Sequence, residues 1–144
     1  MLYDALADPD GATAADLLAA YADELAAAVD GADTSTVAAE TGVDESTVAA
    51  IADRDLDALS TVRLTDAAAI LEAEEGISAD DIDAEVRDHL MMGMVTAILD
   101  VDTIAAEIDA DLTGQEVQRM LEGRTRLTLG DLAEMQALIV DRSP

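Results

Sequence analysis

Apolar residues recur along this chain at the three- and four-residue spacing of helices that bury one face. The two clearest stripes are Leu17, Leu18, Tyr21, Leu25, Val29, and Ile82, Val86, Leu90, Met94, Ala97. The pattern predicts helices over about 13–30, 35–41, 45–53, 65–75, 79–99, 102–109, 114–122 and 128–141. A short arm or helical turn is expected over residues 1–10, ended by Pro9, and a connector over 54–64.

Signals for helix ends support this division. A Ser or Thr followed three residues later by Asp or Glu can form a capping box. Four such pairs open predicted helices: Thr13/Asp16, Ser78/Asp81, Thr113/Glu116 and Thr128/Asp131. Asp44 is a further expected N-cap. Gly residues at 31, 42, 76 and 123 lie where helices are expected to stop.

Composition favours a helical core. Hydrophobic residues make up 51% of the 144 positions, with no Phe or Trp and only two Tyr. The core must therefore be built from Ala, Leu, Ile, Val and Met, several of which are good helix formers. This length allows one domain of ordinary size, or two very small ones that share a core.

Short strings recur in the same order in the two halves of the chain. "TVAAE" at 36–40 matches "TIAAE" at 103–107, and "VRLT" at 62–65 matches "TRLT" at 125–128. We interpret them as a duplication, with an arm at 1–12, a first unit at 13–76 and a second at 77–144. Units of this size are marginal alone, so we expect each to bury surface against the other.

The first unit contains the stretch "VAAETGVDESTVAAI", residues 37–51. Its Ala38, Gly42, Val48 and Ile51 have the spacing of the helix-turn-helix in the Cro and lambda-repressor-like family, which the stretch resembles. Ala is small where the two helices cross, Gly tolerates the left-handed turn, and the last two residues would be buried. Any helical hairpin with a Gly turn is the alternative interpretation.

The second unit resembles the same family less closely. Ala105, Val117 and Leu121 would take the buried positions, but two extra residues separate the first two of them, and Asp109 replaces the turn Gly. The resemblance covers about residues 34–75 and 101–141. It implies an all-α fold of two helix-turn-helix-like units, each of four helices, packed as one compact helical body.

In that family the second short helix enters the DNA major groove. In the first unit this helix would present Asp44 and Glu45, with Arg54 as its only cation, so it is unsuited to phosphate. In the second unit it would present side chains that suit adenine and guanine edges, followed by Arg side chains that suit phosphates. The candidate DNA-binding residues are Gln115, Gln118, Arg119, Arg124 and Arg126.

The charge balance weighs against DNA. The chain has 33 acidic residues, seven Arg and no Lys, for a net charge of -26. Residues 113–126 hold three Arg and two Glu, or +1, so the rest of the chain carries -27. This composition resembles that of proteins from halophilic archaea, where molar salt shortens the Debye length to about 3 Å.

Other features point to simpler expectations. There is no Cys, no secretory signal and no apolar run of membrane-spanning length, so we expect a cytoplasmic protein without a membrane contact. The single His89 lacks partners for a metal site, and no catalytic or cofactor motif is recognisable, so we expect no enzyme, metal or cofactor. "LMMGMV", residues 90–95, suits either an adaptable binding surface or, as we expect, the core, with Gly93 admitting another helix.

Two functions therefore compete: a DNA-binding transcriptional regulator that reads duplex DNA through the second unit, and a non-catalytic interaction or scaffold module. A homodimer or another protein partner is expected in either case. A DNA reader should keep Arg119, Arg124 and Arg126 exposed on one surface. A scaffold should bury them in ion pairs between the units and expose an apolar patch elsewhere.

Overall fold

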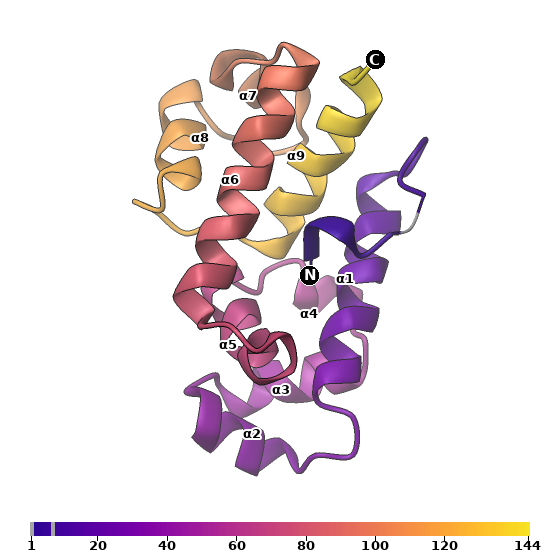
Figure 1. Ribbon diagram of the computed structural model, residues 1–144, viewed down its shortest axis with the longest axis vertical. Coiled ribbons are helices and arrows are strands. Elements are labelled where there is room, and N and C mark those ends of the chain that lie inside the picture. The colour runs from indigo at the N-terminus through magenta and orange to yellow at the C-terminus, as the bar shows by residue number, and fades with distance from the viewer. Residues whose placement is uncertain (1, 7) are drawn as a thin grey trace.

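A computed structural model describes residues 2–6 and 8–144, and this part of the chain is all-α, without a named strand, as the sequence predicts. Residues 1 and 7 of the predicted arm lie outside the described residues. The elements, drawn in Figure 1, are the 3-10 helix η1 (Leu2–Asp4) and the α-helices α1 (Ala14–Ala28), α2 (Thr34–Thr41), α3 (Glu45–Ala52), α4 (Leu56–Leu59), α5 (Leu64–Glu75), α6 (Ala79–Ala97), α7 (Val101–Glu107), α8 (Gly114–Leu121) and α9 (Leu129–Arg142).

The expected caps begin most of the helices. Thr13 and Thr113 form capping boxes with hydrogen bonds in both directions. Ser78 and Thr128 accept the first of the two bonds but not the reciprocal one, and Asp44 occupies its N-cap position without a side-chain bond. The Gly residues at helix ends all have positive φ, between 73° and 76°: Gly31, Gly42, Gly76 and Gly123.

The predicted connector at 54–64 is wrong in part, because it contains the short helix α4. Its N-cap Asp55 accepts a hydrogen bond from the backbone N–H of Ala58, and Leu59 is fully buried. A helix of four residues spans barely one turn, so it leaves no apolar periodicity in the sequence.

Two of the most extensive helix contacts join the two halves of the chain, residues 13–76 and 77–144. α1 packs most extensively against α9, and α5 against α6. Figure 1 shows α6 and α9 running beside each other, with α1 reaching α9 from the other half. Neither half therefore completes its core alone. The predicted boundary at 76/77 falls in the turn between α5 and α6, and the duplication itself stays a prediction.

One backbone contact joins the halves at the centre. An isolated antiparallel bridge pairs Arg63 with Thr128, the N-cap residues of α5 and α9. Its hydrogen bonds run from Leu64 N to Leu127 O (2.8 Å), from Leu129 N to Val62 O (2.8 Å) and from Gly130 N to Ser60 O (3.0 Å). The matched strings at 62–65 and 125–128 thus lie side by side and antiparallel, with Leu64 opposite Leu127.

A buried polar link ties the first residues to both halves. The Tyr21 hydroxyl donates to Gln136 Oε1, and Gln136 Nε2 donates to the carbonyl oxygen of Tyr3 at 2.9 Å. Burial raises the pKa of Tyr21 far above its ordinary value. Since Tyr21 lies on α1 and Gln136 on α9, this link adds a polar connection to the apolar contact between those helices.

The short helix pairs α2–α3 and α7–α8 place the predicted core residues as follows. Val48, Ile51, Val117 and Leu121 are buried, whereas Ala38 and Ala105 are half-buried. Gly42 ends α2 with φ 76°, which is the left-handed turn expected there. In the second pair Ile108 ends α7 in an extended conformation, and residues 108–113 have no positive φ. The turn around Asp109 therefore departs from the first pair, as its sequence indicates.

Among the described residues, no single helix is long and apolar enough to cross a membrane. α6 and α7 together reach that length and composition, but they meet at a bend of 93°.

Candidate nucleic-acid interface

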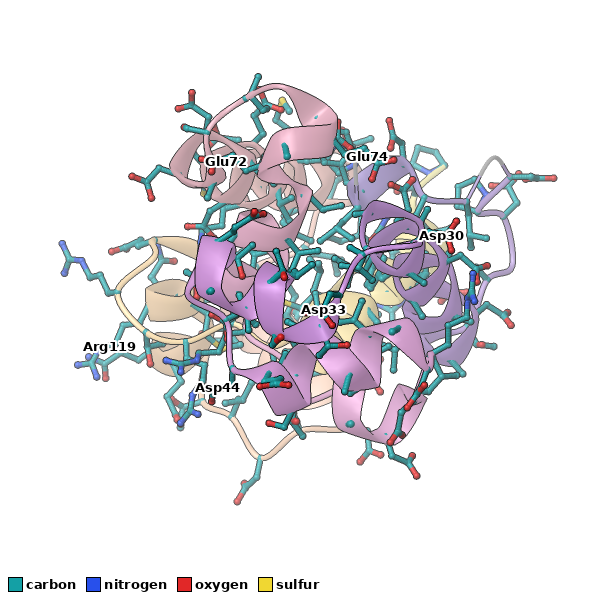
Figure 2. All side chains as sticks on the ribbon, turned by 90° about the horizontal axis from the view of Figure 1, so that it is seen from below. Asp30, Asp33, Asp44, Glu72, Glu74 and Arg119 are labelled. Atoms are coloured by element: carbon teal, nitrogen blue, oxygen red, sulfur yellow. The ribbon has the colours of Figure 1, made fainter. Side chains whose placement is uncertain are left out.

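One face of α8 carries three of the candidate residues. Gln115, Gln118 and Arg119 are exposed, and their spacing of three and four residues places them along one side of the helix. Val117, Met120 and Leu121 occupy the opposite side and are buried. The capping box at Thr113 fixes where α8 begins, and the apolar side fixes which way it faces. Figure 2 shows Arg119 projecting away from the body of the protein.

The other two candidates lie in the segment that joins α8 to α9. Gly123 has φ 76°, and the turn that it makes is closed by a hydrogen bond from Arg124 N to Arg119 O at 2.9 Å. Arg124 and Arg126 are both exposed. The structure thus brings the predicted residues of α8 and of this segment onto adjoining surface.

The pairing of these cations differs from residue to residue. Arg124 Nε lies 3.2 Å from Glu122 Oε2, and Gln118 Nε2 donates to Glu122 Oε1 at 2.7 Å. Arg119 and Arg126 form no ion pair within 4.0 Å among residues 2–6 and 8–144. None of the three Arg side chains is therefore buried in an ion pair between the halves.

Sequence reasoning missed Arg63, which the first half contributes. A hollow of about 260 Å³ is lined by Arg63, Arg124 and Arg126, with the buried Arg87 beneath them. The Arg63 side chain is 58% exposed, and its ion pair with Asp66 is long, at 4.0 Å. The repeated "RLT" string was the signal that could have placed it here. We call Arg63, Gln115, Gln118, Arg119, Arg124 and Arg126 the Arg surface.

Arg87 holds α8 in place from below. Its side chain is 8% exposed, its Nε lies 3.0 Å from Asp83 Oδ1, and its Nη1 donates to the carbonyl oxygen of Met120. A guanidinium presents several donors in a fixed plane, so it can join a carboxylate on α6 to the end of α8 at once. Arg87 therefore positions α8 and is not itself free to bind a partner.

Carboxylates border the Arg surface. Asp44 and Asp66 line an adjoining hollow of about 380 Å³ together with Arg63 and Arg126. In Figure 2, Asp44 lies on the same side of the view as Arg119, whereas Glu72, Glu74 and Asp30 lie away from it. The site is thus a cationic patch at the edge of an acidic body, with the charges close to balance.

The corresponding helix of the first half carries no such patch. α3 begins with Asp44 and Glu45, both exposed. Arg54, which follows α3, lies 3.0 Å from Asp23 Oδ1 on α1 and so faces another element. This placement agrees with the expectation that the first short helix pair is unsuited to phosphate.

His89 takes part in packing. Its ring is stacked on that of Tyr3, with centroids 4.3 Å apart and planes 16° from parallel. Burial raises the pKa of Tyr3, and the negative charges of Glu85, Asp4 and Glu75 raise it further. Within the described part of the chain, no three His, Asp or Glu side chains are grouped so as to hold a metal ion.

The expectation that "LMMGMV" belongs to the core is wrong for part of the segment. Leu90 and Met94 are buried, but Met92 is 62% and Val95 79% exposed. The expected close approach at Gly93 is confirmed, because a Cβ built there would lie 2.8 Å from a methyl carbon of Ile139 on α9. The apolar surface that a scaffold would show is therefore present as well.

Comparisons with known proteins place the chain in a family. Neither the curated proteins nor the solved structures give a match. One family model matches residues 17–142, a range that runs from the first turn of α1 to the end of α9 and so includes both halves and the whole Arg surface. The chain belongs to the family of unknown function DUF5791.

Proposed function

We propose that this protein is a DNA-binding transcriptional regulator that contacts duplex DNA through the Arg surface. One observation carries the proposal: Gln115, Gln118 and Arg119 lie exposed along one side of α8, and Arg119 has no ion-pair partner among the described residues. In a chain with 33 acidic residues, an exposed cation without a carboxylate partner is available to an anionic ligand from outside.

The chemistry of each group fits a part of DNA. In the proposed complex α8 enters the major groove, where Gln side chains pair with adenine and Arg119 pairs with guanine. Arg124 and Arg126 lie beyond the end of the helix, where they reach the phosphates, and Arg63 extends this row from the first half. Glu122 holds Gln118 and Arg124 in the free protein, so it must release them on binding.

The charge balance limits how this binding works. The phosphate contribution scales with the number of cations, and it weakens as salt rises. Four exposed Arg bordered by carboxylates supply few such contacts, so base contacts or a second copy of the surface must supply much of the affinity. We also infer that the protein works in concentrated salt, where repulsion between its remaining carboxylates and DNA is screened. The internal duplication belongs to the same proposal.

A second candidate is a protein-interaction module. The observation that favours it is the exposed apolar group on α6, in which Val95 is 79% and Ile98 92% exposed. Such side chains indicate a protein contact. The two candidates are compatible, because the Arg surface and this group lie on different residues of different helices.

Fluorescence anisotropy with labelled duplex fragments, at several KCl concentrations up to about 2 M, tests the proposal. The Arg119/Arg124/Arg126→Gln variant should lose salt-dependent binding. An Arg54/Arg142→Gln variant is the control, since both of its Arg side chains are paired with carboxylates elsewhere on the protein. Absence of binding by the folded wild type at every salt concentration would overturn the proposal, as would equal losses in the two variants.

A further inference from the structure

The C-terminal part of α6 presents an apolar surface that the rest of the fold leaves uncovered. Met91 is 37% exposed, Met92 62%, Val95 79% and Ile98, directly after the helix, 92%. Residues at 91, 95 and 98 follow helical spacing, so they form one stripe with Met92 beside it. We call these four residues the α6 patch. Two Met side chains make part of the surface adaptable in shape.

Ile98 is unfavourable in the isolated chain for two reasons. Its backbone is left-handed, with φ 56° and ψ 52°, which is rare for a β-branched residue. Its side chain is also almost wholly in water. A residue that is strained and exposed at once persists when something else depends on it, and contact with a partner is the simplest such dependence.

The first half of the chain meets the same backbone requirement without an apolar side chain. α1 is followed by Gly31 in the left-handed conformation, two residues before the N-cap Asp33 of α2. α6 is followed by Ile98, two residues before the N-cap Asp100 of α7. Gly is the residue that this turn favours, so Ile98 is not required by the turn.

The exposed positions of α6 carry larger apolar residues than the corresponding positions of α1 and the turn after it. Counting from the N-caps Thr13 and Ser78, buried positions of α1 with its C-cap coincide with those of α6: Leu17 with Ile82, Tyr21 with Val86, Leu25 with Leu90, and the C-cap Val29 with Met94. The exposed Met92 then corresponds to Ala27 on α1, and Val95 to Asp30 in the turn after α1. Folding of such a helix therefore does not call for a large apolar residue at the position of Met92.

The absence of charged residues from the α6 patch favours a second copy of this chain as its binding partner. Residues 89–99 contain no Asp, Glu or Arg, in a protein that is 28% charged, and the nearest carboxylates along the sequence are Asp88 and Asp100 at the two ends. Two copies meeting here would bury no carboxylate of this segment, and the flanking ones would stay at the rim, where salt screens them. A strongly basic partner would find no carboxylate inside the patch to pair with.

The area fits a weak dimer. Four side chains exposed to this degree present roughly 500 Å², so two copies would bury about 1,000 Å² together, the lower limit for a specific interface. We propose that the α6 patch is the interface of a two-fold homodimer in which the ends of two α6 helices cross. A two-fold contact is self-complementary, so Ile98 of each copy would pack on α6 of the other. This proposal does not depend on DNA binding, although a dimer would present two Arg surfaces.

Sedimentation equilibrium in about 2 M KCl, from about 5 to 500 µM protein, tests the dimer. The wild type should shift from the monomer mass towards twice that mass. Ile98→Gly and Val95→Asp should each raise the dissociation constant at least tenfold. Leu56→Ala, which shortens an exposed apolar side chain on α4, should leave it unchanged and is the matched control.

Ile98→Gly also separates loss of contact from loss of folding. Because Gly relieves the left-handed strain, this variant should melt no lower than the wild type at the low protein concentration where both are monomers. A wild type that stays monomeric over the whole range would overturn the homodimer and leave the α6 patch to a different partner. A dimer that Ile98→Gly and Val95→Asp do not weaken would place the interface elsewhere and overturn the proposal too.

Discussion

Gly130→Ala tests the claim that the bridge between the halves depends on a close backbone approach. A Cβ at this position would lie 2.8 Å from the carbonyl oxygen of Ser60 and 3.3 Å from its Cβ. Both belong to a segment that the bridge holds, so neither can rotate away. Overpacking of this kind costs about 1–3 kcal/mol, and losing the bond from Gly130 N to Ser60 O adds about 0.5–1.5 kcal/mol.

Helix propensity acts in the opposite direction, by at most about 1 kcal/mol, because Ala replaces Gly within α9. The net effect should be a loss of about 1–3 kcal/mol in the free energy of unfolding, measured by urea denaturation at constant KCl. Gly93→Ala is the matched control. There the same 2.8 Å separates the added carbon from Cγ2 of Ile139, a side-chain atom and not a backbone carbonyl, and the helix gains Ala in its middle. If Gly130→Ala were as stable as Gly93→Ala, the reasoning about the bridge would be refuted.

Three further predictions concern single side chains. Arg87→Met should lower the free energy of unfolding by about 2–3 kcal/mol in urea titrations, because Asp83 and the Met120 carbonyl lose a charged donor. A decrease in the free energy of unfolding smaller than that of the exposed Arg126→Gln variant would contradict this role of Arg87. Glu122→Gln should raise DNA affinity about two- to fivefold in anisotropy titrations, since it removes the carboxylate that holds Gln118 and Arg124. Glu74→Gln, a control away from the Arg surface, should leave the DNA affinity unchanged. The hydrogen bond from Thr103 N lowers the pKa of Asp100, so this cap stabilises the fold above about pH 3.9, and its contribution is lost as the pH falls through the lowered pKa. Asp100→Asn caps the helix without titrating, so in urea titrations it should lose less stability than the wild type between about pH 5 and 2. An unchanged difference in stability between the two proteins over this range would refute the role of the cap.

The helices were predictable because their signals are local. Capping residues such as Thr13 and Thr113 act within one turn of their own helix, and the apolar stripes repeat at helical spacing. Which helices of the two halves pack against each other was not predictable, since this pairing depends on contacts between residues far apart in sequence. α4 was missed for the opposite reason: one turn is too short to show a period.

The candidate site was predictable only as far as it lies on one segment. Exposure of Arg119 follows from its place opposite the buried side of α8. Arg63 joins the Arg surface through the bridge, for which the repeated "RLT" string was the only signal in the sequence. Arg87 reaches Met120 through a tertiary contact, so it could not be placed without the fold. Met92 and Val95 were expected in the core because apolar composition alone does not distinguish a buried face from an exposed surface that binds a partner.

The most direct test of the account is to map the DNA contact on the protein by NMR. Adding a duplex fragment to labelled protein in KCl should shift amide signals of residues 114–128 and of Arg63, while those of α2 stay in place. That pattern would establish the Arg surface as the site of contact. An unchanged spectrum, or shifts confined to the α6 patch, would contradict DNA recognition by α8.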